Sequence, residues 1–462
     1  MKKGLRNSGD FSLAEMFPVE AKAATPDETL RFVRFVPSGR RRAKAMSAAP
    51  TPKLERDRRI DLFRGLALVM IFINHMPATP WSLLTSRAWG FSDAAEMFVL
   101  LAGLAAALAY HRYFANGTTG IGLATVFSRM WKLYRTHLFL FLMVGTICVI
   151  GAERFNEPSH LEALGFDTFL QNPGAFLAHV VTLRFLPGYL DILPLYVLLL
   201  ALVPALFLLH RLHWIAPLAL GLALWGAVQG IGFNIPNSRT AREWTFNPFA
   251  WQLLFTIGFV IGLRMRSGLG LGVLGRPLVA RGITIAAALF TVAAFLISAP
   301  WREIPGYENV WLVDPLRIGA ISKTDLSIIR LIDVLAKFWL VMVLIQPDAR
   351  WLSSVPARMT ALMGKHSLEV FALGTIGSIA GGIVIVVNGY HPAIIAAAVL
   401  TGTALMIGMG AFMEWRGGAT ASSRKPRVEA APGSAPALPP TPERRAEPVS
   451  SRSTLLALDP RV

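Results

Sequence analysis

Cysteine and charge are both scarce in this sequence. One cysteine, Cys148, stands among 462 residues, so no disulfide within the chain can hold the fold together. Charged residues make up 16% of the chain and hydrophobic residues 54%, a balance too apolar for an ordinary soluble domain. We therefore expect an integral membrane protein that is held together by helix packing.

The sequence also lacks the motifs of several enzyme classes. It contains no P-loop, no HExxH motif, no Cys/His cluster with metal-ligand spacing and no dinucleotide-binding fingerprint. We therefore predict no metal site and no permanently bound cofactor. An inverted internal repeat, which marks many secondary transporters, is not evident either.

Positive charge is plentiful, with a formal net charge of +17, but it is concentrated in two polar tails and in short loops. This distribution is typical of membrane topology and not of a nucleic-acid groove, so we predict no nucleic-acid partner. Residues 1–56 lack the apolar run of a signal peptide and, like residues 417–462, are predicted to be disordered. Met46 is an alternative translation start, and residues 57–416 form the predicted membrane domain.

Apolar runs of about 20 residues predict an all-α fold with about ten transmembrane helices. The expected spans are 61–80, 92–112, 133–152, 188–209, 214–232, 249–264, 281–299, 325–346, 366–388 and 391–413. Lys and Arg are more frequent in the short loops on one side, so both termini are predicted to be cytoplasmic. The long connections 153–189, 233–248 and 300–324 then lie outside, where they are placed to cover a pocket.

Asn74 and His75 stand near the outer end of the first apolar helix. Ionisable groups inside a bilayer are costly and usually face a bundle interior or a wet cavity, so both are candidates for chemistry. A neutral histidine, with an ordinary pKa of about 6.5, can take a proton from an attacking hydroxyl. The alternative is a buried histidine satisfied by a neighbouring helix, and Pro77 also favours a simple helix end.

Asp93 and Glu96 are three residues apart at the start of the next apolar segment. Either carboxylate is a candidate to orient the imidazole and to stabilise its protonated form. The same spacing fits a capping box, in which Asp93 is the N-cap and Glu96 its partner. Glu96 can serve both purposes.

Arg330, Asp333 and Lys337 recur at spacings of three and four in an apolar helix. They either neutralise each other or, through the excess of positive charge, bind an anionic donor or an acyl carboxylate. Basic residues on the predicted cytoplasmic side are also placed to receive phosphates, although the positive-inside bias explains most of them; they are Arg129, Lys132, Arg135, Lys365 and His366.

Several segments together resemble a known family. They are DLFRGLAL at 61–68, INHMP at 73–77, GFSDAAEMFV at 90–99, LPLY at 193–196, NPFAWQLLF at 247–255 and GKHSLEVF at 364–371. In combination they closely resemble the OpgC family, whose members are inner-membrane proteins that succinylate osmoregulated periplasmic glucans. The resemblance covers about residues 57–413 and excludes both tails.

The resemblance implies an acyltransferase-type helix bundle in the bacterial inner membrane. It implies an acyl-CoA donor, such as succinyl-CoA, on the cytoplasmic side and a glucan acceptor on the periplasmic side. The essential histidine of related O-acyltransferases corresponds to His75. Relatives often carry an acid where this chain has Asn74, so the carboxylate is expected from Asp93 or Glu96.

The predicted reaction is transfer of a succinyl or similar acyl group to a glucan hydroxyl. His75 acts as general base, Glu96 or Asp93 stabilises the imidazolium, and Asn74 or Arg87 polarises the oxyanion. An acyl-histidine intermediate is the main alternative route. The candidate substrate-binding residues are Arg87, Arg64, Arg330, Lys337, Trp251 and Gln252.

Two other functions remain open at this point. One is a transporter or flippase of a glycan or acyl species, and the other is a non-catalytic partner of a glucan synthase.

Overall fold

The structure is a computed structural model that describes residues 57–77, 79–238, 242–267, 276–303, 306–307, 310 and 321–423. The predictions for residues 1–56 and 424–462 lie outside this range. Contacts divide the chain into two units, Met1–Trp415 and Arg416–Val462, and the fold below is that of the first. The final helix runs on to Ser423, so it includes residues 417–423, which the sequence assigns to the tail.

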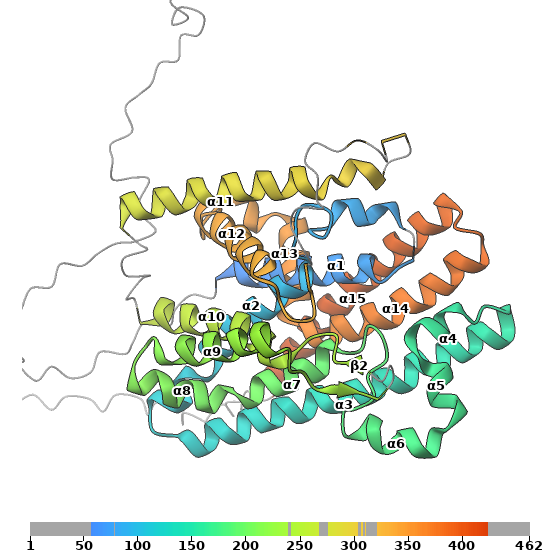
Figure 1. The fold of residues 1–462 in the computed structure, drawn as a ribbon, viewed down its shortest axis with the longest axis horizontal. Helices are drawn as coiled ribbons and strands as arrows, with labels where there is room; N and C mark the ends of the chain where they lie inside the picture. The colour runs from blue at the N-terminus through green and yellow to red at the C-terminus, as the bar shows by residue number, and fades with distance from the viewer. Residues whose placement is uncertain are drawn as a thin grey trace, which may run out of the picture. The chain divides into compact units, whose positions relative to one another are not determined.

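Helices dominate the described residues (Figure 1). They are α1 (Arg58–Asn74), α2 (Ala94–Ala115), α3 (Thr119–Phe155), α4 (Ser159–Leu164), α5 (Phe166–Gln171), α6 (Pro173–Val181), α7 (Ile192–Ala201), α8 (Val203–Leu212), α9 (Ala216–Ile231), α10 (Pro248–Arg266), α11 (Pro277–Ser298), α12 (Ile328–Leu344), α13 (Val355–Lys365), α14 (Ser367–Val387) and α15 (Pro392–Ser423). Short 3-10 helices include η1 (Pro80–Leu84) and η3 (Pro300–Glu303). Strands β1 (Pro236–Asn237) and β2 (Arg242–Glu243) pair antiparallel.

A helix or helix pair occupies each of the ten predicted spans. Among the described residues, six helices are long and apolar enough to cross a membrane, namely α2, α3, α10, α11, α14 and α15. The pair α7 and α8 brings the number to seven if it forms one span, while α9 is shorter. The structure therefore shows an all-α, multi-pass membrane protein, and the count of ten spans is not established.

Two predicted spans are interrupted by proline. Helix α1 ends at Asn74 and not at residue 80. Pro77 follows closely, and a proline disfavours helical backbone at the residue before it. The span predicted at 188–209 is broken into α7 and α8, which are bent by 40°. Pro204, at the start of α8, lacks the backbone N–H that a continuous helix would use.

Helix α3 is longer than predicted. Its 37 residues cover roughly 55 Å at 1.5 Å per residue, more than the bilayer core of about 30 Å. The basic residues before position 133 are therefore helical and not part of a loop. After α3, the predicted outer connection 153–189 contains the short helices α4, α5 and α6, which lie together in Figure 1.

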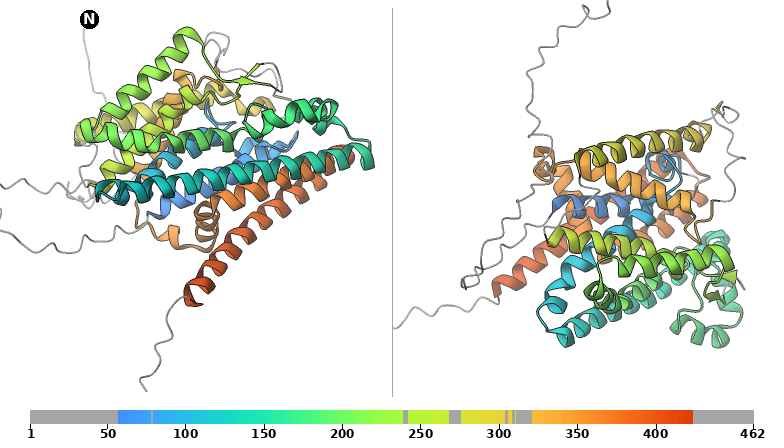
Figure 2. Two further views of the ribbon diagram at one scale, coloured as in Figure 1. Left: turned by 90° about the horizontal axis from the view of Figure 1, so that it is seen from below. Right: turned by 60° about the vertical axis from the view of Figure 1, so that its left-hand side comes forward.

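Glycines allow the central helices to approach closely. A Cβ on Gly103 of α2 would overlap the backbone of Phe255 in α10, and one on Gly258 would overlap that of Leu100. Small residues let the backbones of membrane helices approach closely and so gain packing contacts. Helices α2 and α10 consequently form the buried centre, and Figure 2 shows α3 beside α14 around them.

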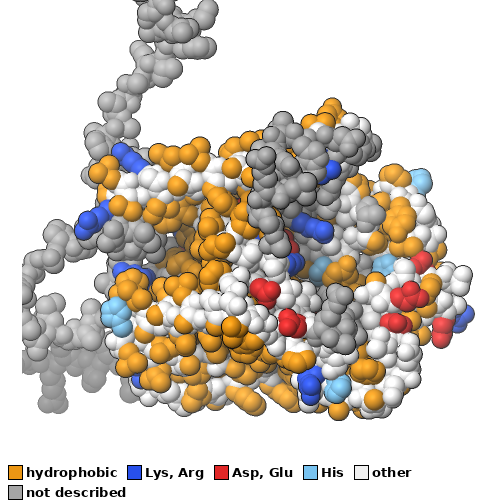
Figure 3. All heavy atoms as spheres, viewed as in Figure 1, with side chains coloured by type: hydrophobic (Ala, Val, Ile, Leu, Met, Phe, Trp, Pro, Cys, Tyr) orange, Lys and Arg blue, Asp and Glu red, His pale blue; other side chains and the backbone are white. Residues whose placement is uncertain are grey.

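The periphery is apolar. Helix α11 packs against α12 and is mostly exposed, with Leu278 and Leu289 projecting outward. Hydrophobic side chains cover α11 and much of α8 on the face seen in Figure 3. An exposed apolar helix surface of this kind is suited to lipid.

Candidate functional site

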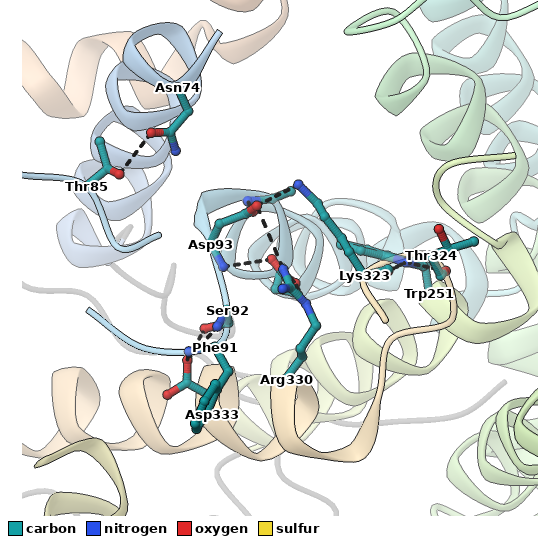
Figure 4. A network of polar contacts seen from close by, with 12 residues as sticks. Asn74, Thr85, Phe91, Ser92, Asp93, Trp251, Lys323, Thr324, Arg330 and Asp333 are labelled. Atoms are coloured by element: carbon teal, nitrogen blue, oxygen red, sulfur yellow. Dashed lines mark hydrogen bonds and ion pairs between the residues drawn. The ribbon is translucent and has the colours of Figure 1, made fainter. Parts of the chain in front are cut away.

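Asn74 and His75 lie where α1 ends. His75 is the C-cap residue, and Asn74 Oδ1 accepts a hydrogen bond of 2.9 Å from the Thr85 hydroxyl after η1 (Figure 4). The His75 ring stacks on Tyr189, with ring centroids 4.2 Å apart and an angle of 23° between the planes. Tyr189 has a φ of 66°, a left-handed backbone that is uncommon for a non-glycine residue. The connection before α7 therefore orients the imidazole.

The His75 imidazole is held in its neutral form. Its Nδ1 is buried and has no hydrogen-bond partner among the described residues. Because His75 lies beyond the end of α1, it is outside the candidate spans. Burial, and then the Lys323 ammonium, lowers the pKa of His75 below its ordinary value, while the Asp93 carboxylate acts in the opposite direction. A neutral ring with an unpartnered nitrogen is suited to accept a proton.

Asp93 and Glu96 form a complete capping box at the start of α2. Asp93 Oδ1 accepts a hydrogen bond of 2.8 Å from the Ala95 backbone N–H, and Glu96 Oε2 accepts one of 3.0 Å from the Asp93 N–H. The capping interpretation is therefore confirmed.

Each of these two carboxylates is paired with a cation. Lys323 Nζ lies 2.5 Å from Asp93 Oδ2, and Arg330 Nε donates to Glu96 Oε1 over 2.7 Å. Figure 4 shows both cations converging on the start of α2. Burial acts to raise the pKa of Asp93, but the Lys323 ammonium and the hydrogen bonds that the Asp93 side chain accepts from Lys323 and from the Ala95 backbone N–H hold it well below its usual range. Two carboxylates and two cations thus form a charge-balanced cluster next to His75, which we call the His75 cluster.

A second buried pair supports the loop before α2. Asp333 Oδ2 accepts hydrogen bonds from the Ser92 N–H (2.7 Å), the Ser92 hydroxyl (2.6 Å) and Lys337 Nζ (2.7 Å). Asp333 is fully buried, as is Glu96. The charged stripe of α12 is thus largely neutralised, partly by Glu96 of α2 and partly within α12. In this placement Lys337 positions the α2 start.

Lys323 is held by the connection before α12. The Trp251 indole N–H donates to the carbonyls of Lys323 (3.0 Å) and Thr324 (3.1 Å), and Gln229 Nε2 donates to the Asp325 carbonyl (2.7 Å). Trp251 is fully buried in α10, so a rigid helix fixes this loop. Lys323 and Tyr189 were not predicted as site residues, since both lie in connections without a periodic pattern.

The other predicted substrate-binding residues lie apart from the cluster. Arg64 is buried eleven residues before His75, roughly 16 Å along a helix axis, and donates to the Ser367 hydroxyl over 2.6 Å. Gln252 is buried and donates to the Gly221 carbonyl over 2.8 Å. Arg87 is exposed in the connection between η1 and α2. Their placement supports structural roles for Arg64, Trp251 and Gln252.

The contact expected between the imidazole and a carboxylate is not made in this structure. Asp93 and Glu96 are occupied by the α2 cap and by the two cations, and the Tyr189 ring holds His75 in place. The Asp93 carboxylate acts on His75 through its charge. Among the described residues, no three His, Cys, Asp or Glu side chains are grouped to hold a metal ion.

Comparison with known proteins identifies the family. No curated protein and no solved structure matched the chain. The family model described as OpgC protein matches residues 56–417, which include α1 to α14 and every residue of the cluster. The chain therefore belongs to the OpgC family.

Proposed function

We propose that this protein is a membrane acyltransferase that transfers a succinyl or similar acyl group from acyl-CoA to hydroxyl groups of periplasmic glucans. The observation that carries the proposal is the neutral His75, with its unpartnered Nδ1, beside the Asp93–Lys323 pair. Membership of the OpgC family supports a glucan-modifying transferase.

The reaction needs one proton acceptor and one site for developing negative charge. His75 removes the proton of the glucan hydroxyl as the oxygen attacks the thioester carbonyl carbon. A new C–O bond forms, the C–S bond breaks, and the leaving thiolate takes the proton from His75. The product is an ester and free coenzyme A, with atoms and charge balanced.

Lys323 is the cation best placed for the acyl group. Its side chain is 38% exposed, compared with 11% for Arg330, so it can reach a ligand without leaving Asp93. An ammonium at this point stabilises either the tetrahedral oxyanion or the free carboxylate of a succinyl group. Asn74, whose amide is fixed by Thr85, is the second donor.

The proposed orientation follows from the loop charges. Both termini lie in the cytoplasm, the protein is in the inner membrane, and the His75 cluster lies near the periplasmic surface. The donor approaches from the cytoplasm and the glucan from the periplasm.

Direct transfer in vitro tests this function. Purified full-length protein is mixed with labelled succinyl-CoA and linear or cyclic β-glucan, and labelled acidic glucan is expected. His75→Ala should lower the rate by about 10²- to 10⁴-fold, the usual contribution of a general base. His391→Ala, an exposed histidine outside the cluster, is the matched control and should keep the rate.

Three outcomes would each contradict one part of the proposal. Full activity of folded His75→Ala would exclude the base assignment, and labelled protein trapped by acid quench would indicate an acyl-histidine route. Movement of unmodified glucan across vesicles without acyl-CoA would favour a transporter. Parallel reactions with acetyl-CoA, read by the mass added to the glucan, identify the acyl group.

A further inference from the structure

A basic groove lies at the opposite end of α2 from His75. It has a volume of about 500 Å³ and is formed by the C-terminal turns of α2 and the first half of α3. Its lining includes four cations and two tyrosines, namely Tyr110, Arg112, Tyr113, Arg129, Lys132 and Arg135. We refer to these six residues as the α2–α3 groove.

The cations of this groove are poorly matched by acids. Among the salt bridges of the described residues, only Lys132 has a carboxylate partner, Glu369 of α14 at 2.5 Å. Arg112 lies over the Tyr113 ring at 4.6 Å and Arg135 over the Trp131 ring at 5.9 Å. Three guanidinium groups therefore line one cavity with one carboxylate nearby.

The arrangement fits phosphate. Arg129, Lys132 and Arg135 are three residues apart and share a face of α3, while Arg112 comes from α2. Guanidinium groups donate two parallel hydrogen bonds to phosphate oxygens, and several cations around one cavity match a ligand with more than one phosphate. Positive-inside bias explains basic residues near a membrane surface, but it does not require that they line a common cavity.

We propose that the α2–α3 groove binds the phosphate groups of a phosphate-bearing ligand. Tyr110 is 16 residues after Ala94, so the groove lies roughly 24 Å along α2 from the His75 cluster. If the proposed function holds, the phosphates of a long acyl donor bind in this groove. The thioester of the donor must then reach the other end of α2. An anionic lipid headgroup offers the same phosphate chemistry.

Binding to the purified full-length protein tests the proposal without turnover. Titration with coenzyme A in a nonionic detergent is compared for the unmodified protein, for R129Q/R135Q and for R281Q, an exposed arginine of α11 that serves as the matched control. We expect R129Q/R135Q to weaken binding at least tenfold and R281Q to leave it within twofold. Binding should also weaken steeply with added salt.

A second arm distinguishes the lipid source. Lipid nanodiscs containing phosphatidylglycerol or only phosphatidylcholine are used, and retained lipid is counted by mass spectrometry after extraction in detergent. Selective loss of phosphatidylglycerol from R129Q/R135Q, with no coenzyme A binding, assigns the groove to a headgroup. Equal behaviour of R129Q/R135Q and R281Q in both arms overturns the proposal. His75→Ala should bind coenzyme A normally, so failure of the proposed base leaves this test intact.

Discussion

The cations at the two ends of α2 differ in whether they are paired with carboxylates. At the N-terminal end, Lys323 and Arg330 each contact a carboxylate, and Glu96 is fully buried. At the C-terminal end, Arg112, Arg129 and Arg135 line an open groove. Among the described residues, none of these three arginines forms a salt bridge with a carboxylate.

The difference separates two uses of positive charge. A buried carboxylate carries a large desolvation cost unless it is paired, so Arg330, the partner of the fully buried Glu96, is required by the fold itself. Cations in an open groove are hydrated, and they are not needed to neutralise a buried carboxylate. Charge near His75 therefore sets the electrostatic field of the site, whereas charge in the α2–α3 groove is available to a ligand.

The largest effect should come from breaking the buried pair. Arg330→Ala leaves Glu96 buried beside Asp93 without its cation, and we expect a loss of about 3–5 kcal/mol in the free energy of unfolding. Thermal or denaturant unfolding in detergent measures it. Lys365→Ala breaks the exposed pair with Glu414 and should cost at most about 1 kcal/mol. Similar losses for the two variants would remove the contrast between buried and exposed pairs.

Loss of Lys323 should affect catalysis more than folding. In Lys323→Met the ammonium that stabilises the developing charge is absent, and we expect the transfer rate to fall about 10²- to 10³-fold. Arg154→Gln, an exposed arginine at the end of α3, is the control. A normal rate for Lys323→Met would show that its charge serves only to neutralise Asp93.

The pH dependence of transfer should report the field on His75. Its pKa is lowered, so the neutral base persists as the pH falls below about 6.5 and activity is lost only at more acidic pH. Lys323 contributes to this lowering, and its removal favours the protonated ring and raises the pKa. The acid limb of the residual activity of Lys323→Met should therefore move to higher pH, by up to about one unit. An unchanged acid limb would contradict this coupling.

The smallest effect is expected on stability at the groove. Arg135→Gln removes an exposed charge without a carboxylate partner, and the free energy of unfolding should change by less than about 0.5 kcal/mol. Denaturant unfolding measures this value beside Arg330→Ala. A large loss would mean that the groove cations hold α2 against α3, as the cations do near His75.

Local patterns were enough to predict much of the site. The spacing of Asp93 and Glu96 predicted the capping box, because capping depends only on the first turn of one helix. The spacing of Arg330, Asp333 and Lys337 likewise predicted one charged face, and the structure confirms it on α12. The resemblance of the motifs predicted the family, which the comparison confirms.

Partners across the bundle were not predictable in this way. Arg330 pairs with Glu96 of α2, more than two hundred positions earlier in the chain, and no local pattern encodes that contact. Lys323 and Tyr189 lie in irregular connections, where neither helical period nor hydropathy distinguishes one residue from the next. The break between α7 and α8 could have been predicted from Pro204, since proline interrupts a helix from its own position.

The sequence by itself determined the membrane class, the approximate helices, the capping of α2 and the presence of a histidine after the first helix. These properties depend on apolar content, period and neighbouring residues. The tertiary structure decided that Tyr189 stacks on His75, that Lys323 holds Asp93, and that cations of α2 and α3 share one groove. Such contacts depend on which helices pack together, and the close glycine contacts between α2 and α10 set that arrangement only once the chain is folded.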